Sequence, residues 1–491
     1  MWLVNEYGVR TMNLAEQLKQ QCTIENSKGG NYYATTYNAN LDFYSSLSRF
    51  NKTSSIDLKF ANALNENKLI ALANLLYLLD IREGKGERRI FKTAFKYLCL
   101  NDFDSAKIII PFIGQLGRYD YLLEGLHTPV EEAVVRYISK TLEKDLSCDN
   151  PSLLAKWLPS HKNGNKTNQE AKYLMKQLGI TEEKYRKILS SLRKKINIVE
   201  SKLTNKEYDA INYEQVPSKA MLKYKKAFKR NDAEAYNEYL DSVKKGEKKI
   251  NTKGLFAYEI VKEVWSKGKK DETLLDMMWE NQKDVLKGLT KNVLVVADTS
   301  GSMTCCNRIP LASSIGLAIY TAERNSGLFK DMFITFSSRP SLQLVQGKTI
   351  CDKVKNIRAI IDSTDIDKVF QLILDTMEKG KGTQEDLPSH ILIISDMEFD
   401  YGVYSEGGTN FQGWKKIFEE KGYQLPKIIF WNVAAYTNGC PVTKYDNDVA
   451  MVSGFSTNVL ENIFSLENYK PEEAMLFTLK KYIDLLDRKS F

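Results

Sequence analysis

The stretch VLVVADTSGSM, residues 293–303, decides the fold of the C-terminal part of this chain. Five consecutive apolar residues at its start are typical of a β-strand that is buried on both faces of a sheet. The strand runs directly into Asp298, and hydroxyl side chains follow at the alternate positions Ser300 and Ser302. A carboxylate and two hydroxyls after a buried strand predict either a capped turn or a ligand-binding loop at the edge of a sheet.

The sequence from residue 291 to residue 491 alternates between apolar runs and amphipathic segments. The runs that predict strands are NVLVVAD (292–298), DMFITFS (331–337), HILIISD (390–396), KIIFWNVAA (427–435) and DVAMVSG (448–454). Strands that alternate with helices are typical of a doubly wound, mostly parallel sheet. Ligands bind such sheets at the carboxyl ends of the strands. We therefore expect Asp298 and Asp396 at the same edge.

Residues 1–290 contain one helical pattern after another. In NKLIALANLLYLLDIREGKG (67–86), apolar residues recur at helical spacing and two glycines end the pattern. A long amphipathic helix is predicted over TEEKYRKILSSLRKKINIVESKL (181–203). Short helices joined by polar turns predict a packed, HEAT-like array. The predicted domains are thus a helical domain at 1–290 and an α/β domain at 291–491.

The composition is that of an ordinary folded protein, with 43% hydrophobic and 27% charged residues among 491. No apolar run approaches the roughly 18 residues that a membrane-spanning helix needs, and the first residues lack the pattern of a secretory signal. Seven cysteines without framework spacing fit reduced thiols. We expect a cytoplasmic protein with no membrane partner. Three histidines without ligand spacing argue against a zinc site and against histidine-based catalysis.

The side chains of Asp298, Ser300 and Ser302 are hard oxygen donors, which Mg²⁺ and Mn²⁺ prefer. One carboxylate and two hydroxyls supply too little charge for a calcium cage. They suit a Mg²⁺ or Mn²⁺ ion that keeps water ligands and an open position. Asp396 adds a second carboxylate at the same predicted edge. For residues 298–302 alone, an Asx-type turn that caps the next helix explains the pattern equally well.

The DTSGS loop, a Thr-Asp pair and the Ser-Asp pair at the end of a later strand resemble the metal-ion-dependent adhesion site of von Willebrand factor A domains. The resemblance implies a Mg²⁺ ion whose coordination is completed by a carboxylate of a partner. The ligands that it implies are Asp298, Ser300, Ser302, Thr364 and Asp396. Thr383 is the alternative threonine. We prefer Thr364, because it precedes the helix that leads to the Asp396 strand, although Asp362-Ser363 stands where that family usually has a glycine.

Eight further motifs together resemble one uncharacterised family, which joins a helical region to a von Willebrand A domain and occurs in phages, large viruses, bacteria and plants. They are IREGKGER (81–88), LGRYDYLL (116–123), KWLPS (156–160), YRKILSSLR (185–193), VPSKA (216–220), SDMEFD (395–400), FWNV (430–433) and VSGFS (452–456). The match covers most of residues 30–470. The domain order, the GKGER segment and the adhesion-site motif are more distantly similar to the Ro (TROVE) ribonucleoproteins, whose helical-repeat region binds RNA.

Positive charge is concentrated in the helical part. Residues 156–249 contain 23 Lys/Arg against 12 Asp/Glu, whereas residues 291–470 contain 18 against 21. This asymmetry indicates a polyanion-binding surface, and the similarity to Ro proteins implies that the polyanion is RNA. The residues predicted to contact RNA are Lys85, Arg88, Lys184, Lys187, Arg193, Lys194 and Lys195.

Two features of the helical part each fit two interpretations. The interleaved aromatics are candidates for stacking on bases, but the alternative is a solvated lysine-rich helix face with its aromatics in the core. They are Tyr185, Tyr208, Tyr213, Tyr224 and Phe228. The segment IREGKGERR (81–89) is either a backbone phosphate cradle or a place where one helix stops and the next begins.

These observations predict a non-enzymatic binding protein. No Ser-His-Asp or Cys-His arrangement is credible with three histidines, and Ser300 stands where a dehalogenase-type phosphatase needs a second aspartate. We expect RNA and an acidic protein ligand as partners, Mg²⁺ or Mn²⁺ as the cofactor and no small-molecule substrate. The alternatives are a protein-only adaptor or scaffold in phage, viral or host interactions, and a metal-dependent phosphoesterase.

Overall fold

The computed structural model describes residues 3–4, 10–11, 23–25, 31–161, 166–268, 270–288, 291–336, 339–358, 365–400, 409–435 and 439–488. The chain folds into two compact units, each built from separate segments. Unit 1 comprises Met1–Ala71, Phe256–Asp276 and Asp284–Lys481, and unit 2 comprises Leu72–Leu255, Met277–Lys283 and Tyr482–Phe491. The predicted domain boundary near residue 290 stays a prediction, since these units group the helices 39–66 and 257–265 with the sheet rather than with the other helices.

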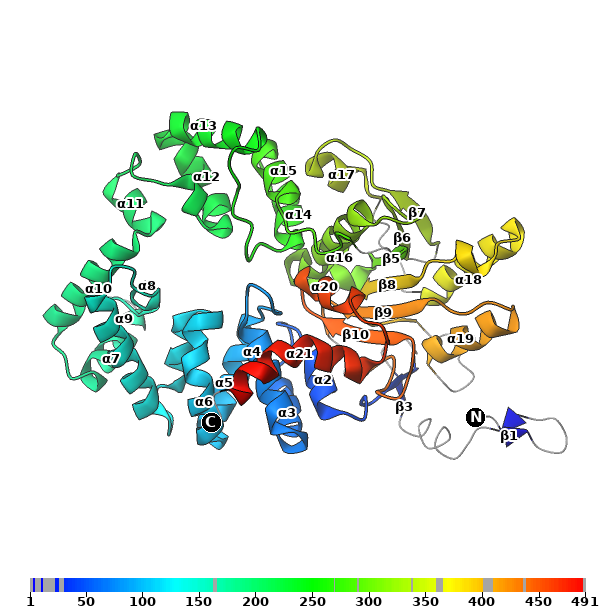
Figure 1. Cartoon of the computed structure of the whole chain (residues 1–491), viewed down its shortest axis with the longest axis horizontal. Coiled ribbons are helices and arrows are strands. Elements are labelled where there is room, and N and C mark those ends of the chain that lie inside the picture. Colours follow the sequence, from blue (N-terminus) through cyan, green and yellow to red (C-terminus); the bar gives the residue numbers. More distant parts are fainter. Residues whose placement is uncertain are drawn as a thin grey trace. The chain divides into compact units, whose positions relative to one another are not determined.

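A six-stranded mixed sheet lies at the centre of unit 1, with the strand order β10-β9-β8-β5-β6-β7 (Figure 1). All neighbouring strands are parallel except β7, which is antiparallel to β6. The strands are β5 (Val293–Asp298), β6 (Met332–Phe336), β7 (Ser341–Leu344), β8 (His390–Ser395), β9 (Lys427–Asn432) and β10 (Val449–Ser453). The five predicted strands are confirmed. The edge strand β7 was not predicted, because four residues are too few to stand out as a pattern.

The order of the strands reverses direction at β5. From β5 the chain moves to its neighbour β6 on one side, and it later returns to β8 on the other side. In open α/β sheets, such a reversal opens a crevice at the carboxyl ends of the two strands, where ligands bind. Asp298 ends β5 and Asp396 directly follows β8.

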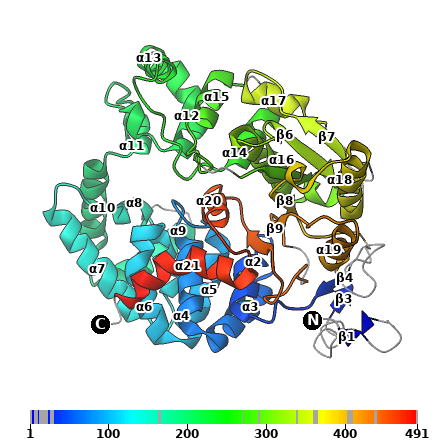
Figure 2. The ribbon, with the colours of Figure 1, turned by 45° about the vertical axis from the view of Figure 1, so that its right-hand side comes forward.

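Helices cover the sheet of unit 1. The central helix α16 (Cys305–Arg324) is buried from Pro310 to Ala322 and packs against β5, β6 and β8. Helix α14 (Ala257–Trp265) packs on α16 (Figure 2). The other helices of this unit are α2 (Ala39–Ser45), α3 (Thr53–Glu66), α17 (Ile350–Asn356), α18 (Ile366–Gly380), α19 (Asn410–Glu420) and α20 (Asn458–Phe464). Three helices have residues in both units, namely α4 (Lys68–Leu79), α15 (Glu272–Glu280) and α21 (Pro471–Asp487).

Two short antiparallel strand pairs belong to the N-terminal segment. Strand β1 (Leu3–Val4) pairs with β2 (Arg10–Thr11), and β3 (Thr23–Glu25) pairs with β4 (Asn31–Tyr33). Residue Tyr33 of β4 also forms an antiparallel bridge with Cys440.

Unit 2 is a helical array, as the sequence predicts. Its helices are α5 (Arg88–Asn101), α6 (Phe103–Leu116), α7 (Glu131–Ser147), α8 (Leu154–Trp157), α9 (Lys166–Gln177), α10 (Glu182–Ile196), α11 (Val199–Asn205), α12 (Ser218–Asn231) and α13 (Ala233–Lys244). The single long helix predicted over 181–203 is wrong. The chain breaks at Asn197, whose backbone is left-handed with φ 55°, a conformation that Asn tolerates better than most residues. Among the described helices, none combines the length and hydropathy that crossing a bilayer requires.

The segment IREGKGERR is a helix stop and restart between α4 and α5. The backbone N–H groups of Lys85 and Glu87 donate to the carbonyls of Tyr77 and Leu78, at 3.0 and 2.9 Å. A phosphate cradle needs backbone N–H groups that are available to a ligand. Because these two are already used inside the turn, the segment closes on its own helix.

Candidate metal centre

Asp298 and Asp396 come together because they follow neighbouring parallel strands. Ala297 of β5 pairs with Ile394 of β8, so the two strands end side by side. The loop after β5 continues into a short 3₁₀ turn over Gly301–Thr304 before α16 begins. The predicted meeting of the two carboxylates at one edge of the sheet is thus present in the fold.

One hydroxyl links the two carboxylates. Ser395 Oγ donates to Asp298 Oδ2 at 2.6 Å and lies 3.5 Å from Asp396 Oδ1. The other oxygen of Asp298 accepts from the backbone N–H of Ser300 at 2.8 Å. Ser300 Oγ and Ser302 Oγ lie 3.0 Å apart. Ser395 is a residue that the sequence reasoning did not assign to the site, although its place directly before Asp396 was visible.

Both carboxylates are buried, and Asp298 carries a clear electrostatic cost. The side chains of Asp298 and Asp396 are 0% exposed. Burial raises the pKa of Asp298 above its usual range, and the nearby negative charge of Asp396 raises this pKa further. Within the described residues, Asp396 Oδ2 is buried and has no hydrogen-bond partner. A divalent cation between the two acids would offset the repulsion and would give this oxygen a partner.

The oxygen ligands of this site suit a hard cation, and two of them are charged. It consists of two carboxylates and the hydroxyls of Ser300 and Ser302, all oxygen donors of the kind that Mg²⁺ and Mn²⁺ take. In the described parts of the chain, no group of three or more His, Cys, Asp and Glu side chains could hold a metal ion. The acids alone are therefore too few for a calcium cage, and the hydroxyls have to complete the set.

Left-handed backbone occurs close to both acids in sequence. Cys306, Asn307 and Arg308, at the start of α16, have φ values of 49°, 59° and 57° and interrupt the helix there. Met397, directly after Asp396, has φ 65°. Such conformations cost about 1–2 kcal/mol for each residue other than Gly and cluster at functional sites.

The fifth predicted ligand, Thr364, lies outside the described residues. The next residue, Asp365, caps α18 by accepting from the backbone N–H of Lys368 at 3.2 Å. The alternative Thr383 is exposed and caps a short turn with Asp386, whose carboxylate lies 3.0 Å from Thr383 Oγ1. Thr383 precedes the amino end of β8, which begins at His390. Thr383 therefore lies before the amino end of β8, whereas Asp396 follows the carboxyl end of the same strand.

The predicted RNA-contacting residues do not form one free cationic surface. Lys85 is buried, with 1% exposure, and burial lowers its pKa to about 8. Arg88 forms an ion pair with Asp120 at 2.9 Å, and Lys187 forms one with Glu183 at 2.7 Å.

The remaining predicted RNA contacts lie on α10. The Arg193 guanidinium donates to the carbonyls of Ala155 and Leu158, and Lys195 Nζ lies 3.3 Å from the carbonyls of Leu146 and Cys148. Lys184 and Lys194 are exposed.

Three of the aromatic residues considered for base stacking lie in the core of unit 2. Tyr185 and Phe228 are 0% exposed, and Tyr213 is 4% exposed. The rings of Tyr213 and Phe228 pack against each other, with centroids 5.2 Å apart. These three rings are not available to bases, whereas Tyr208 and Tyr224 are half-buried.

The sequence resembles proteins without assigned function. Residues 152–295 match a domain of unknown function, DUF2828, and residues 292–484 match a second one, DUF7788. Over 500 residues, the chain is 31% identical to the uncharacterized protein L728 of Acanthamoeba polyphaga mimivirus, across 93% of this chain and 87% of that protein. By this identity and coverage, the chain belongs to the same family as the mimivirus protein L728.

Proposed function

We propose that this is a non-enzymatic binding protein whose α/β unit holds Mg²⁺ or Mn²⁺ between Asp298 and Asp396 and uses the ion to bind an acidic group of a partner. The observation that carries the proposal is the pair of fully buried carboxylates at the switch point of the sheet, with Asp396 Oδ2 unpartnered among the described residues. Burying two acids together is costly unless a cation joins them.

The ion would act as the recognition element. Asp298 and Asp396 would supply the charge, and Ser300 and Ser302 would supply neutral oxygens, which leave the ion able to attract a further anion. A partner carboxylate is a ligand of the same hard-oxygen class. Ser395 would orient both acids, because its hydroxyl lies between them.

Titration of the full chain with Mn²⁺, followed by electron paramagnetic resonance of the free ion, tests the metal. We expect one site in the wild type and none in Asp298→Ala or in the milder Asp298→Asn. The control Glu420→Gln removes an exposed acid at the end of α19 and should bind Mn²⁺ like the wild type. Equal Mn²⁺ binding by all four proteins would show that Asp298 is not a metal ligand and would contradict the proposed site. Turnover of a model phosphodiester that requires Mg²⁺ and Asp298 would favour the phosphoesterase alternative.

We propose RNA binding as a second function, and helix α12 is the element that favours it. Its sequence SKAMLKYKKAFKRN contains six Lys/Arg and no Asp or Glu. Lys219, Lys223, Lys226 and Arg230 are all exposed and follow the spacing i, i+4, i+7, i+11. At 3.6 residues per turn, they lie within roughly 60° of the helix circumference. The buried Met221 and Phe228 occupy the opposite side.

This stripe, defined as Lys219, Lys223, Lys226 and Arg230, suits a chain of phosphates. Successive cations lie about one helical turn, ~5.4 Å, apart in a single line. A line of evenly spaced cations can neutralise successive phosphates of one strand without reading bases. Helix α10 differs in sequence, because it contains Glu182 and Glu183, which pair with Arg186 and Lys187, whereas α12 contains no acid.

The stripe can be tested against a matched change on α10. One variant replaces the four stripe residues with alanine, and the control replaces Lys184, Arg186, Lys187 and Lys194 with alanine. Binding of a fluorescent 20-nucleotide single-stranded RNA is measured over a range of salt concentrations. With four phosphate contacts, loss of the stripe should reduce the slope of log K against log salt by about 3. A larger loss in the α10 variant, or no RNA binding by the wild type, would contradict the proposal.

A further inference from the structure

The N-terminal strand β4 lies against loops at the carboxyl edge of the sheet, and these loops are far from β4 in sequence. Tyr33 and Cys440 exchange two backbone hydrogen bonds, of 2.9 and 2.8 Å. The following segment continues this contact: Ser453 Oγ donates to the carbonyl of Tyr44 at 2.9 Å, and Asn51 Nδ2 donates to the carbonyl of Ala435 at 2.8 Å. The segment from Asn31 to Asn51 is thus tied to the chain that follows β9 and to the end of β10.

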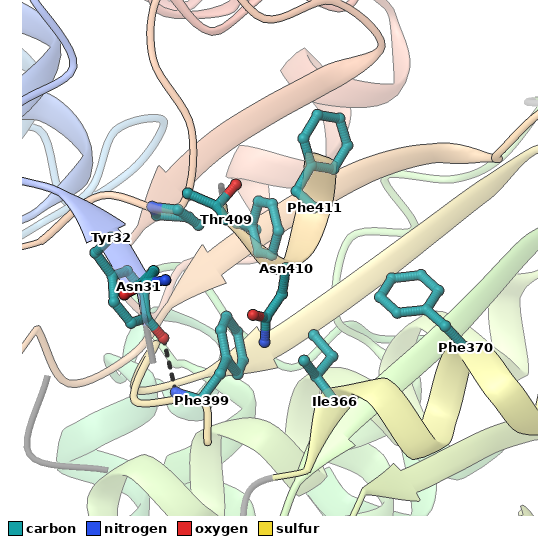
Figure 3. Close-up of a pocket in the computed structure, with 10 residues that line it drawn as sticks. Asn31, Tyr32, Ile366, Phe370, Phe399, Thr409, Asn410 and Phe411 are labelled. Atoms are coloured by element: carbon teal, nitrogen blue, oxygen red, sulfur yellow. Dashed lines mark hydrogen bonds between the residues drawn. The ribbon is translucent and has the colours of Figure 1, made fainter. Parts of the chain in front are cut away.

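A further contact of β4 reaches the loop that follows Asp396. The backbone N–H of Phe399 donates to Tyr32 Oη at 2.7 Å, between residues 367 positions apart (Figure 3). The two rings stack with centroids 6.3 Å apart and an angle of 17°. Tyr32 and Phe399 are 2% and 3% exposed, so water does not compete for this bond.

The surroundings of this bond are tightly packed. A pocket with room for about one water molecule lies beside it (Figure 3). Its lining residues are Asn31, Tyr32, Ile366, Phe370, Phe399, Thr409, Asn410, Phe411, Phe430 and Pro441. Because half of these lining residues are aromatic, the loop cannot shift there without losing packing.

Hydrogen bonds restrain the loop between Asp396 and Phe399. Asp396 Oδ1 accepts from the N–H of Glu398 at 3.1 Å, and the N–H of Met397 donates to Ser395 Oγ at 3.0 Å. Met397 itself has the left-handed φ of 65°. A turn of four residues with these bonds fixes the Asp396 carboxylate at one end when Phe399 is fixed at the other.

We propose that Tyr32 is a positioning residue for the metal centre: its hydroxyl holds Phe399 N–H and thereby keeps Asp396 aimed at the ion. The inference rests on the proposed function, in which Asp396 holds a divalent cation. Partners that orient metal ligands from behind contribute strongly to affinity. Coupling between two sites is reciprocal, so the ion also strengthens the docking of β4.

Tyr33 provides a matched control on the same strand. It is 3% exposed, and its hydroxyl accepts from Gln412 Nε2 at 2.7 Å. Gln412 belongs to α19 and not to the loop after Asp396. Tyr32→Phe and Tyr33→Phe therefore each remove the hydroxyl of a buried tyrosine of β4, but it is the Tyr32 hydroxyl that accepts from the Asp396 loop, at Phe399 N–H.

The first measurement is Mn²⁺ affinity of the full chain, by electron paramagnetic resonance, for the wild type and both variants, together with their melting temperatures. We expect Tyr32→Phe to bind Mn²⁺ about 10-fold to 100-fold more weakly and Tyr33→Phe to bind like the wild type. Similar melting temperatures for the two variants would separate positioning from general stability. Wild-type affinity in Tyr32→Phe, or equal losses in both variants, would overturn the inference while leaving the metal site intact. No Mn²⁺ binding by the wild type would overturn the proposed function and this inference together.

The second measurement tests the reverse direction with Mg²⁺ and hydrogen exchange followed by mass spectrometry. Saturating Mg²⁺ should slow exchange in peptides that contain Tyr33 and Phe399 in the wild type, and should do so less in Tyr32→Phe. If Mg²⁺ binds and exchange in both peptides stays unchanged, the metal and β4 are not coupled.

Discussion

Asp298 lies fully buried beside Asp396, and this pairing makes the stability of the metal-free protein depend on pH. Burial and the charge of Asp396 both raise the pKa of Asp298 in the folded state. A raised pKa of an acid means that the folded protein holds the proton more tightly than the unfolded chain. Stability is then greatest below the ordinary pKa of 3.8 and falls as the pH rises through the raised pKa.

We therefore predict that Asp298 contributes a loss of stability to the metal-free wild type as the pH rises from 5 to 8, and that this contribution is absent from Asp298→Asn. The difference between the two proteins over this range should be at least about 1 kcal/mol, since one unit of pKa shift corresponds to about 1.4 kcal/mol. Urea denaturation in the presence of a chelator measures it. Added Mg²⁺ should reverse the trend in the wild type alone, because binding to the folded state stabilises it. Parallel pH profiles for both proteins would contradict the prediction.

His390 provides a pH effect of the opposite sign. Burial, together with the charges of Lys291 and Lys427, lowers its pKa to about 3. The unfolded chain takes up a proton near pH 6.5 while the folded protein does not, so stability falls as the pH drops below about 6.5. We predict that His390→Gln loses about 2 kcal/mol less than the wild type between pH 7 and pH 5. Urea denaturation at the two pH values checks this, and an equal loss would show that His390 titrates normally.

At the scale of elements, the contact between α14 and α16 depends on a glycine. A Cβ atom at Gly316 would lie 3.0 Å from the backbone carbon of Ala257 and 3.2 Å from the backbone nitrogen of Tyr258. The helix backbones therefore approach more closely than a side chain permits. Gly380, the last residue of α18, has no atom within 4 Å of the same position.

We predict that Gly316→Ala destabilises unit 1 by about 1–3 kcal/mol, because overpacking outweighs the gain in helix propensity. Gly380→Ala should be neutral or should stabilise the protein by up to about 1 kcal/mol. Denaturation of both variants by urea is the measurement. A stabilised Gly316→Ala variant would show that the two helices can move apart at little cost.

Local patterns explain why most elements could be predicted. Strands β5, β8, β9 and β10 are buried along nearly their whole length, so their apolar runs reveal them. The break between α10 and α11 could not be read in this way, because the apolar face continues past Asn197 through Val199. One left-handed residue ended the helix without changing the pattern around it.

At the scale of the whole molecule, the stripe and the metal centre belong to different compact units. We predict that the two binding activities are separable. The variant of α12 that lacks the stripe should keep wild-type Mn²⁺ affinity, and Asp298→Asn should keep wild-type RNA affinity. Each affinity is measured as above, with and without the other ligand. A change in RNA affinity on addition of Mg²⁺ would show coupling, which would then have to act in both directions.

The sequence by itself determined the fold class and part of the candidate site. Alternating apolar runs specify the strands, and the order of the strands brings Asp298 and Asp396 to one edge, because residues that follow neighbouring parallel strands meet there. Ser300 and Ser302 were also predictable, since they belong to the same loop.

Only the tertiary structure decided which groups surround these acids. Ser395 bridges to Asp298 across 97 positions and Tyr32 holds Phe399 across 367, and no local period relates residues so far apart. The same holds for charge. The sequence placed a basic surface within 156–249, but Glu183 offsets the charge of Lys187, and the Arg193 guanidinium donates to backbone carbonyls. Composition reports how many charges a segment carries, whereas the fold decides which of them remain available.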